Sequence, residues 1–436
     1  MPKFNTSLFA CLCALSLLIA ACGGSDENEP APEDLPSLDD VLGDLPEAEA
    51  DAYDPAADVL RYTGEAHLRN VKQLTFGGDN AEAYWSFDDE YLIFQSSWDQ
   101  LTKQGCDQIF IMRADGEPME AGKQYALVST DRGRTTCSYF MKDGRVLFAS
   151  THERNDDCPK PPASAEGRYV WPIYDSYDIW ACETDRSNMT MLIHGPGYDA
   201  EATVSPDGKY IVFTSTRSGD LELWRYEIET GDLLQLTNTL GYDGGAFFSL
   251  DSKKIVWRAS RPTGKDAETY KSLLKNGMVE PSDMNVYVAD ADGKNVVQVT
   301  NLPGANWAPY FHPDGERILF SSNHHSIETS GGREFDIFMI NVDGTGLERI
   351  TYSGTFDAFP MFSFDGTKLA FGSNRRADRA SSRETNVMVA EWVENPTDAD
   401  RNFVSSVAMP GAGNHGHGGH GHGDDHSEGE GHGHSH

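Results

Sequence analysis

The stretch EATVSPDGKYIVFTSTRSGDLELWRY, residues 201–226, contains the pattern that decides the fold. Three short apolar runs are separated by Pro-Asp-Gly and by Arg-Ser-Gly-Asp, which are typical turn sequences between β-strands. The same order of strand, aspartate turn, strand, Ser-rich loop and strand recurs along the chain. The turn aspartates lie 55, 64, 44, 63 and 51 residues apart and are Asp88, Asp143, Asp207, Asp251, Asp314 and Asp365.

A fourth, closing strand follows each of the first five units but not the last. A matching segment, VKQLT at residues 71–75, instead precedes the first unit. An N-terminal strand that completes the last sheet closes a ring of four-stranded blades and removes the exposed edge. The spacing of the turns also fits propeller blades with variable loops. We therefore predict an all-β fold over residues 61–395, a six-bladed β-propeller of four-stranded antiparallel blades closed by this N-terminal strand.

The repeats resemble those of a known family. SPDGKYIVFTSTRSGDLELW at residues 205–224, HPDGERILFSS at residues 312–322 and DIFMINVDGTGLERIT at residues 336–351 are similar to the repeats of TolB-like propellers, also called PD40 or WD40-like repeats. The resemblance covers roughly residues 68–393 and implies the propeller fold, but no activity, because one fold hosts many functions. Similar propellers cap prolyl-oligopeptidase-type hydrolases, yet neither G-x-S-x-G nor H-E-x-x-H occurs in this sequence.

The N-terminus has the features of a targeting segment. Lys3 precedes an apolar run that is too short for a comfortable membrane span. The run ends in Ile-Ala-Ala-Cys at residues 19–22, which resembles a bacterial lipobox. We expect residues 1–21 to be a lipoprotein signal peptide and the thiol of Cys22 to carry the lipid; a plain secretory peptide is the alternative. The residue after the cysteine is Gly23 rather than Asp, which favours sorting to the outer membrane. The protein could face either the periplasm or the cell surface.

Residues 22–60 form an acidic tether in this interpretation. The segment from Ser25 to Asp58, both included, contains thirteen Asp and Glu residues, and no Lys or Arg occurs between Lys3 and Arg61. Such a segment repels itself and buries too little apolar surface to order, although it could also bind a partner. The whole chain has a formal net charge of −34, which argues against nucleic acid as a partner.

Insertions mark one face of the predicted ring. His152–Ser176, Arg261–Asp283 and His324–Glu334 all lie between the second and third strands of their units, on the side opposite the turn aspartates. Insertions that gather on one face of a repeat protein usually form its binding side. We call this side the insertion-rich face.

Alignment of the units on their turn aspartates predicts a ring of polar residues near the axis of this face. Asp199, Glu201, Asp243 and Asp357 could hold calcium through oxygen ligands, and three arginines could bind a carboxylate or phosphate. The same residues could instead cap turns or pair with one another within the blades. The remaining predicted members of this ring are Glu82, Asn306, Arg217, Arg261, Arg375, His152 and His324.

The longest insertion is rich in aromatic residues, among them Tyr169, Trp171 and Tyr174. Aromatic side chains in a segment that extends over the ring predict a wall for a sugar ring, a peptide or a partner side chain. The alternative is that they only hold the insertion on its own blade.

Four cysteines remain beyond the signal peptide and Cys22, and they allow three pairings. We expect a disulfide between Cys106 and Cys158, with Cys137 left free near the axis. Residues 396–436 are predicted to be a linker and a disordered tail that binds zinc, nickel or copper through neutral imidazoles. The tail histidines are His415, His417, His420, His422, His426, His432, His434 and His436.

These features favour a non-enzymatic, exported lipoprotein of the cell envelope. It would present its insertion-rich face to an envelope protein, a peptide or a glycan, and its tail to metal ions. The alternative is a metal-dependent hydrolase or lyase at the axial mouth. In that case Asp199, Glu201 and Asp243 would hold the ion, and Arg217 or Arg261 would stabilise negative charge.

Overall fold

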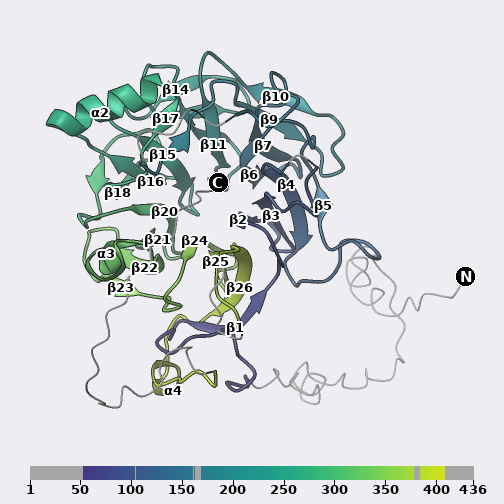
Figure 1. Cartoon of the computed structure of the whole chain (residues 1–436), viewed down its shortest axis with the longest axis vertical. Helices are drawn as coiled ribbons and strands as arrows, with labels where there is room; N and C mark the ends of the chain where they lie inside the picture. The colour runs from purple at the N-terminus through teal and green to yellow at the C-terminus, as the bar shows by residue number, and fades with distance from the viewer. Residues whose placement is uncertain (1–52, 104, 161, 163–167, 378–382, 408–436) are drawn as a thin grey trace, which may run out of the picture. The chain divides into compact units, whose positions relative to one another are not determined.

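The computed structural model describes residues 53–103, 105–160, 162, 168–377 and 383–407. Within them, six four-stranded antiparallel sheets surround a central axis, as predicted (Figure 1). Blade 1 consists of β2 (Asn80–Trp85), β3 (Tyr91–Ser96), β4 (Gln108–Arg113) and β5 (Ala126–Leu127). Blade 2 consists of β6 (Thr135–Phe140), β7 (Val146–Ser150), β9 (Asp178–Cys182) and β10 (Thr190–Ile193). Blade 3 consists of β11 (Asp199–Val204), β12 (Tyr210–Ser215), β13 (Glu222–Glu227) and β14 (Leu233–Gln235). Blade 4 consists of β15 (Asp243–Phe248), β16 (Lys254–Ser260), β18 (Met284–Asp290) and β19 (Val297–Gln298). Blade 5 consists of β20 (Asn306–Phe311), β21 (Arg317–Ser322), β22 (Asp336–Asn341) and β23 (Glu348–Arg349). Blade 6 consists of β24 (Asp357–Phe362), β25 (Lys368–Ser373), β26 (Asn386–Trp392) and β1 (Leu68–Gln73).

The ring closes through the N-terminal strand. β1 pairs antiparallel with β26, with Leu68 opposite Trp392 and Gln73 opposite Met388. The prediction of a closing strand is therefore confirmed, although β1 begins three residues before the expected segment and ends two residues before its end. Pairing of β1 with β26 completes the sheet of blade 6 and covers the edge that β26 would otherwise expose.

Repeated turn chemistry sets the first hairpin of the blades. In blade 3, Ser205 Oγ donates to Asp207 at 2.7 Å and accepts from the backbone N–H of Tyr210 at 2.9 Å. The same Ser–Asp pair occurs in blades 1, 4 and 6. Side chains that bond nearby backbone groups in this way fix a turn. The large apolar residues of the strands fill the space between neighbouring sheets and form the buried core.

Each first strand carries a β-bulge at its third residue. The strand pairing shifts register there in all six blades. The bulged residues have φ between 43° and 58°, a left-handed conformation that an L-residue adopts at a cost. The six bulge residues are Glu82, Cys137, Glu201, Gly245, Ala308 and Phe359.

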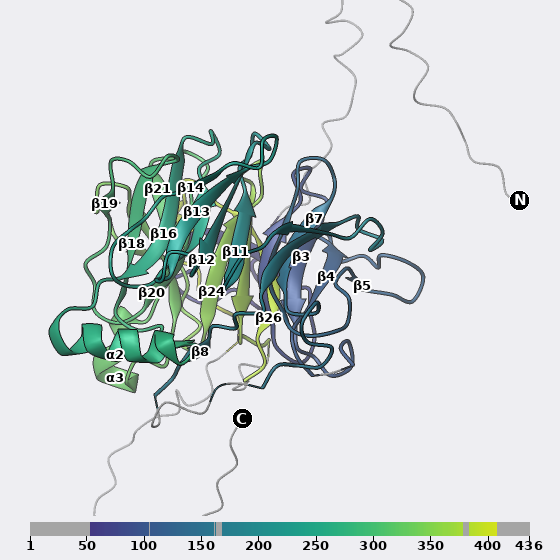
Figure 2. The same ribbon diagram turned by 90° about the horizontal axis from the view of Figure 1, so that it is seen from above.

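The insertions build extra structure on one side of the ring. Figure 2 shows α2 (Gly264–Lys275), α3 (Ile327–Ser330) and β8 (Trp171–Pro172) on the same side. β8 pairs antiparallel with β17 (Met278–Val279), so the insertion of blade 2 reaches that of blade 4. α2 buries Ala267, Tyr270 and Leu273 against this ribbon and the ring. A short 3-10 helix, η1 (His324–Ser326), precedes α3.

Both flanking segments pack closer to the propeller than the predicted boundaries imply. Residues 53–60, which we assigned to the tether, lie against blade 6, because Asp58 accepts the backbone N–H groups of Asn70 and Val71 at 2.8 and 3.0 Å. A bulge in β1 leaves these two donors without strand partners. Asp400 in α4 (Asp398–Arg401) forms two 2.7 Å hydrogen bonds with Arg69, within the predicted linker.

In the part of the chain described here, no helix has both the length and the apolar character needed to cross a membrane. The predicted lipidation site Cys22 and the tail histidines lie outside the described residues.

Candidate functional site

A cavity of about 800 Å³ opens on the insertion-rich face at the axis of the ring. All six bulge residues line it, because the bulges turn their side chains toward the axis. Strands and loops of several blades and the insertion of blade 2 supply the walls. We call this cavity the axial pocket, and its other lining residues used below are Tyr84, Asp107, Arg134, Trp171, Tyr174, Tyr198, Tyr242, Arg258, Glu280, Trp307 and Phe335.

Glu201 is the most heavily bonded group of the pocket. Its Oε1 accepts from Arg258 Nη2 at 3.0 Å, from Tyr198 at 3.2 Å and from the hydroxyl of Tyr242. Its Oε2 accepts from Thr214 at 2.9 Å and from the backbone N–H of Gly245 at 2.6 Å. The carboxylate is 7% exposed, and its acceptor positions are filled by protein groups. Glu201 therefore connects blades 3 and 4, and its carboxylate has little capacity left to bind a ligand.

Arg258 fits beside this carboxylate because blade 4 has glycine at the bulge. A Cβ atom at Gly245 would lie 1.7 Å from Arg258 Nη1. The guanidinium instead fills that space and stacks over the rings of Tyr242 and Trp171, at 5.0 and 5.4 Å from their centroids. Burial lowers the pKa of Arg258, but the charges of Glu201 and of the surrounding groups outweigh it and raise the pKa above its usual value.

Glu82 occupies the same bulge position in blade 1 but has a different environment. Its Oε2 accepts from the hydroxyl of Tyr84 at 3.4 Å, and the thiol of Cys137 also bonds the carboxyl. Burial raises the pKa of Glu82 to about 7, and the Glu201 charge acts in the same direction, against the Cys137 hydrogen bond and the Arg258 charge. The carboxyl group of Glu82 therefore changes its protonation state near neutral pH.

The aromatic segment of the blade 2 insertion forms one wall of the pocket. Trp171 makes edge contacts with Tyr242 of blade 4 and Trp307 of blade 5, with ring centroids 6.5 and 6.0 Å apart. Trp307 in turn packs against Phe335 and Phe359. Residues 168–177, which we call the aromatic arm, thus contact blades 4 and 5 as well as their own blade. Tyr169, Trp171 and Tyr174 of the arm line the pocket, and Tyr169 is 74% exposed.

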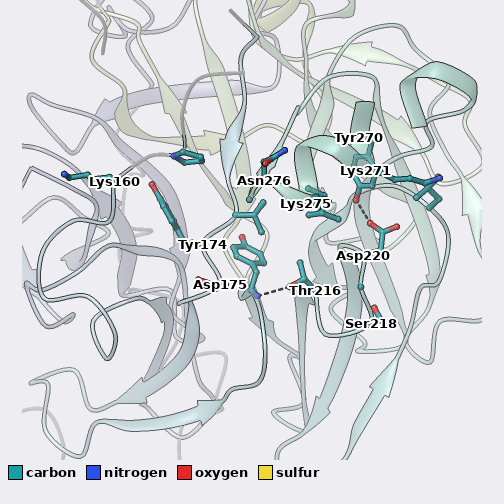
Figure 3. A pocket seen from close by; sticks show the side chains of 17 residues that line it. Lys160, Tyr174, Asp175, Thr216, Ser218, Asp220, Tyr270, Lys271, Lys275 and Asn276 are labelled. Carbon is teal, nitrogen blue, oxygen red and sulfur yellow. Dashed lines mark hydrogen bonds between the residues drawn. The ribbon is translucent and has the colours of Figure 1, made fainter. Parts of the chain in front are cut away.

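A second hollow of about 790 Å³ lies on the other side of the aromatic arm. Figure 3 shows Tyr174 of the arm across this hollow from Tyr270 and Lys271 of α2. Asp220 of blade 3 accepts the Tyr270 hydroxyl at 2.5 Å and so ties α2 to the ring. Ile173, Tyr174 and Tyr198 line both hollows, so the arm separates two neighbouring cavities.

The ring of acids and arginines expected near the axis forms ion pairs inside single blades. Each pair joins the first residue of a first strand to an arginine one or two positions beyond the second strand. The three aspartates are 0% exposed, so they are buried beneath the face and do not line the pocket. The pairs are Asp199 with Arg217 at 2.7 Å, Asp243 with Arg261 at 2.6 Å, and Asp357 with Arg375 at 3.1 Å.

The polar residues predicted for the other blades have similar local partners. Asn306 bonds Ser322 at 2.6 Å, and His324 Nδ1 bonds the same hydroxyl at 2.8 Å. His152 Nδ1 bonds Ser150 at 2.8 Å, and burial lowers the pKa of His152 to about 4. Within the described residues, no group of three or more His, Cys, Asp or Glu side chains is arranged to hold a metal ion. The structure does not bring the four carboxylates of the expected calcium site together.

The cysteines of the insertion-rich face have two different states. Cys106 of blade 1 and Cys158 of the blade 2 insertion form a disulfide, which ties the start of that insertion to the neighbouring blade. Cys137 is a free thiol in the axial pocket, and burial and the nearby glutamates raise its pKa well above the usual value. A thiol with a raised pKa is a poor nucleophile at neutral pH.

Several pocket residues were not predicted, namely Arg258, Tyr198, Tyr242 and Trp307. The sequence does contain a signal for Arg258. When the units are aligned on their turn aspartates, Arg258 falls at the same position of the second strand as Gln95 and Ser321. Those two side chains accept backbone N–H groups from the bulge residues of the next blades. This strand position therefore faces the axis in blades 1, 4 and 5.

Comparisons with known proteins agree with the repeats. Residues 277–380 match the family model described as PD40, TolB beta propeller domain, which confirms the expected resemblance in that region. The uncharacterized protein Atu1656 of Agrobacterium fabrum is 34% identical over 89 residues, which are 20% of this chain and 28% of that protein. The chain thus spans under a third of the length of this curated relative.

Solved structures with similar folds include two TolB proteins. TolB from Acinetobacter baumannii is 20% identical with a TM-score of 0.47, and the alignment covers 66% of this chain and 57% of that one. The putative TolB from Agrobacterium tumefaciens is 14% identical with a TM-score of 0.47, over 74% of this chain and 97% of that one.

Proposed function

We propose that this chain is a binding protein that holds a peptide segment of a partner protein in the axial pocket of its insertion-rich face. The observation that carries the proposal is the pocket itself, which has aromatic walls on several blades and polar groups only at defined points. Ligand sites typically combine such apolar walls with a few oriented polar groups. Aromatic residues are also enriched where proteins bind one another.

The state of the polar groups favours a peptide over a glycan. A sugar ring needs many hydrogen-bond partners, because each hydroxyl loses water on binding. Here the Glu201 carboxylate is bonded by protein donors, and the carboxylates of Asp199 and Asp243 are buried in ion pairs. Aromatic side chains such as Trp171 and Trp307 remain, and they suit apolar or cationic side chains of a peptide.

The metal-dependent alternative has less support. It requires Asp199, Glu201 and Asp243 to coordinate one ion, but each of the three carboxylates is paired with a different arginine. It also requires Arg217 or Arg261 to contact substrate, and both are the partners of buried aspartates. Release of these arginines would leave unpaired buried charges, which is strongly unfavourable.

The N- and C-terminal segments add two further proposals that rest on the sequence. We propose that Cys22 is lipidated and anchors the chain in the outer membrane, and that the histidines of residues 415–436 bind zinc, nickel or copper. Cys22→Ser should move the protein from the membrane fraction to the soluble fraction. Retention of this variant in the membrane fraction would contradict the anchor.

The binding proposal can be tested with the full chain on a random peptide library and on a glycan array. We expect selective enrichment of peptides, with Trp171→Ala and Trp307→Ala losing most of the signal. Lys253→Ala, at a turn on the opposite face, is the matched control and should bind normally. Enrichment of glycans alone, or peptide binding that both tryptophan variants retain, would overturn the proposal.

A further inference from the structure

We infer that Glu82 at the floor of the axial pocket receives a positively charged group of the bound partner, the ammonium of a lysine or the guanidinium of an arginine. The inference rests on the proposed function, since it names the side chain that the peptide places in the pocket. It follows from the charges of the pocket floor, from the way in which Arg258 binds the carboxylate of Glu201 in the same pocket, and from the cavity beside Glu82.

Among the described residues that line the pocket, Glu82 is a carboxylate without an ion-pair partner. Glu201 is paired with Arg258 at 3.0 Å, and Asp107 at the wall is paired with Arg134 at 3.2 Å. Among the described residues, Glu82 forms no ion pair, and its hydrogen bonds come from the neutral groups of Tyr84 and Cys137. Glu82 is half-buried and lines the cavity, so its carboxyl group is open to a ligand.

The other charged residues of the lining are located away from this carboxyl group or already have partners. Glu280 pairs with Arg168 of the aromatic arm at 3.0 Å. Arg333 is exposed in the insertion of blade 5, and it lines the cavity without an ion pair to Glu82 in the described residues. The excess negative charge of the floor therefore belongs to Glu82.

Arg258 shows how this pocket holds a cation. Its guanidinium bonds the bulge carboxylate of Glu201 and lies over the faces of Tyr242 and Trp171. Glu82 is the bulge carboxylate of blade 1 and has the aromatic ring of Tyr84 beside it, with the ring of Phe247 5.7 Å from Tyr84. The two bulge positions thus offer similar chemistry, a carboxylate beside aromatic rings, and of the two carboxylates only that of Glu201 forms an ion pair with a cation among the described residues.

The shape of the surroundings selects an organic cation with an apolar stem. A lysine or arginine side chain buries its methylene groups along apolar surface while its head group finds a carboxylate. Tyr84 and Phe247 line the pocket together with Glu82, and their rings suit that stem. A hard divalent ion needs six or more oxygen ligands, and the described residues provide no such cluster here.

Two small probes of the same size separate charge from shape. Phenethylammonium and neutral 2-phenylethanol have the same ring and chain length and differ in the terminal group. We expect the full-length protein at pH 8 to bind phenethylammonium about tenfold more tightly than 2-phenylethanol, measured by ligand-observed NMR titration. Glu82→Gln should abolish this preference and leave the affinity for 2-phenylethanol unchanged. The matched control is Glu120→Gln, which removes an exposed carboxylate paired with Lys123 outside the pocket and should retain the preference.

A second measurement guards against a change of pocket structure in the variant. Binding of phenethylammonium to the wild-type protein should strengthen from pH 6 to pH 8, because ionised Glu82 is the receptor, whereas binding of 2-phenylethanol should not change. Equal affinities of the two probes in the wild type, or a preference that Glu82→Gln retains, would overturn the inference. Failure of both probes, with library peptides still bound through Trp171 and Trp307, would overturn it while the proposed function stands.

Discussion

The guanidinium of Arg258 in blade 4 bonds the carboxylate of Glu201 in blade 3, with 3.0 Å between Nη2 and Oε1. Both side chains project toward the axis, and the missing side chain of Gly245 provides the space for the guanidinium. This contact joins neighbouring blades and shapes the floor of the axial pocket at the same time. Pocket geometry and fold stability are therefore coupled at this position.

Gly245→Ala should destabilise the protein and deform the pocket floor. The added methyl group would lie 1.7 Å from Arg258 Nη1, and the residue must keep a φ of +58°. We expect the free energy of unfolding to fall by about 2–4 kcal/mol, from backbone strain and from displacement of a buried ion pair. Urea unfolding followed by tryptophan fluorescence measures the change.

Gly315→Ala is the control for this substitution. Gly315 also has a positive φ, +73°, but an added Cβ there meets no atom within 4 Å. The control should therefore lose only the backbone term of about 1 kcal/mol. Equal losses in the two variants would show that Arg258 does not depend on the space above Gly245.

Arg375→Met should strongly destabilise the closure of the ring. Arg375 is fully buried and bonds both Glu65 at 3.0 Å and Asp357 at 3.1 Å, so its loss leaves two carboxylates without their cation. Removal of one partner from a buried ion pair costs about 3–5 kcal/mol. Arg145→Met, which removes a part-exposed pair with Asp143, should cost about 0.5 kcal/mol or less. Similar denaturation midpoints for the two variants would contradict a structural role of Arg375.

Glu82 should make stability depend on pH in a defined direction. Its pKa is raised from 4.5 to about 7 in the folded state, so the folded state binds more protons than the unfolded state between these values. Its contribution to stability is therefore fully present below about pH 4.5 and is lost as the pH rises to about 7. Glu82→Gln should match the wild type near pH 4.5 and become relatively more stable toward pH 8.

The difference between Glu82→Gln and the wild type cancels groups common to both proteins, such as His152, whose pKa is lowered to about 4. Urea unfolding at pH 4.5, 6, 7 and 8 gives this difference directly. A constant difference across the range would mean that the carboxyl group of Glu82 has its ordinary pKa. An opposite slope would mean that a cation of the protein stabilises its charged form.

The repeat pattern made the fold predictable. Turn aspartates such as Asp207 and the displaced closing strand β1 are local sequence features, and they fix the number of blades and the way the ring closes. Alignment of the units also placed Glu82 and Glu201 in the ring of polar residues near the axis. Alignment of the units shows which residues occupy equivalent positions around the axis, but it does not show which of these positions are buried.

Side-chain contacts could not be predicted from the same pattern. Asp243 and Arg261 belong to the predicted ring, but their 2.6 Å pair, which removes both from the pocket, depends on side-chain geometry. Arg258 fits into the space left by Gly245 only because the bulge brings these two neighbouring strands into this arrangement. Asp58 looked like one more acid of a disordered tether, because the bulge of β1 that supplies its two donors is not visible in the sequence.

The most direct test of the account is the affinity of a library-selected peptide for the full chain, measured by isothermal titration calorimetry. Trp307 lies at the centre of the aromatic wall, between Trp171, Phe335 and Phe359. We predict that Trp307→Ala weakens binding by at least about tenfold, as expected for an aromatic anchor, with the Lys253→Ala control unchanged. Undiminished affinity in Trp307→Ala, with the variant folded, would contradict the claim that the axial pocket is the binding site.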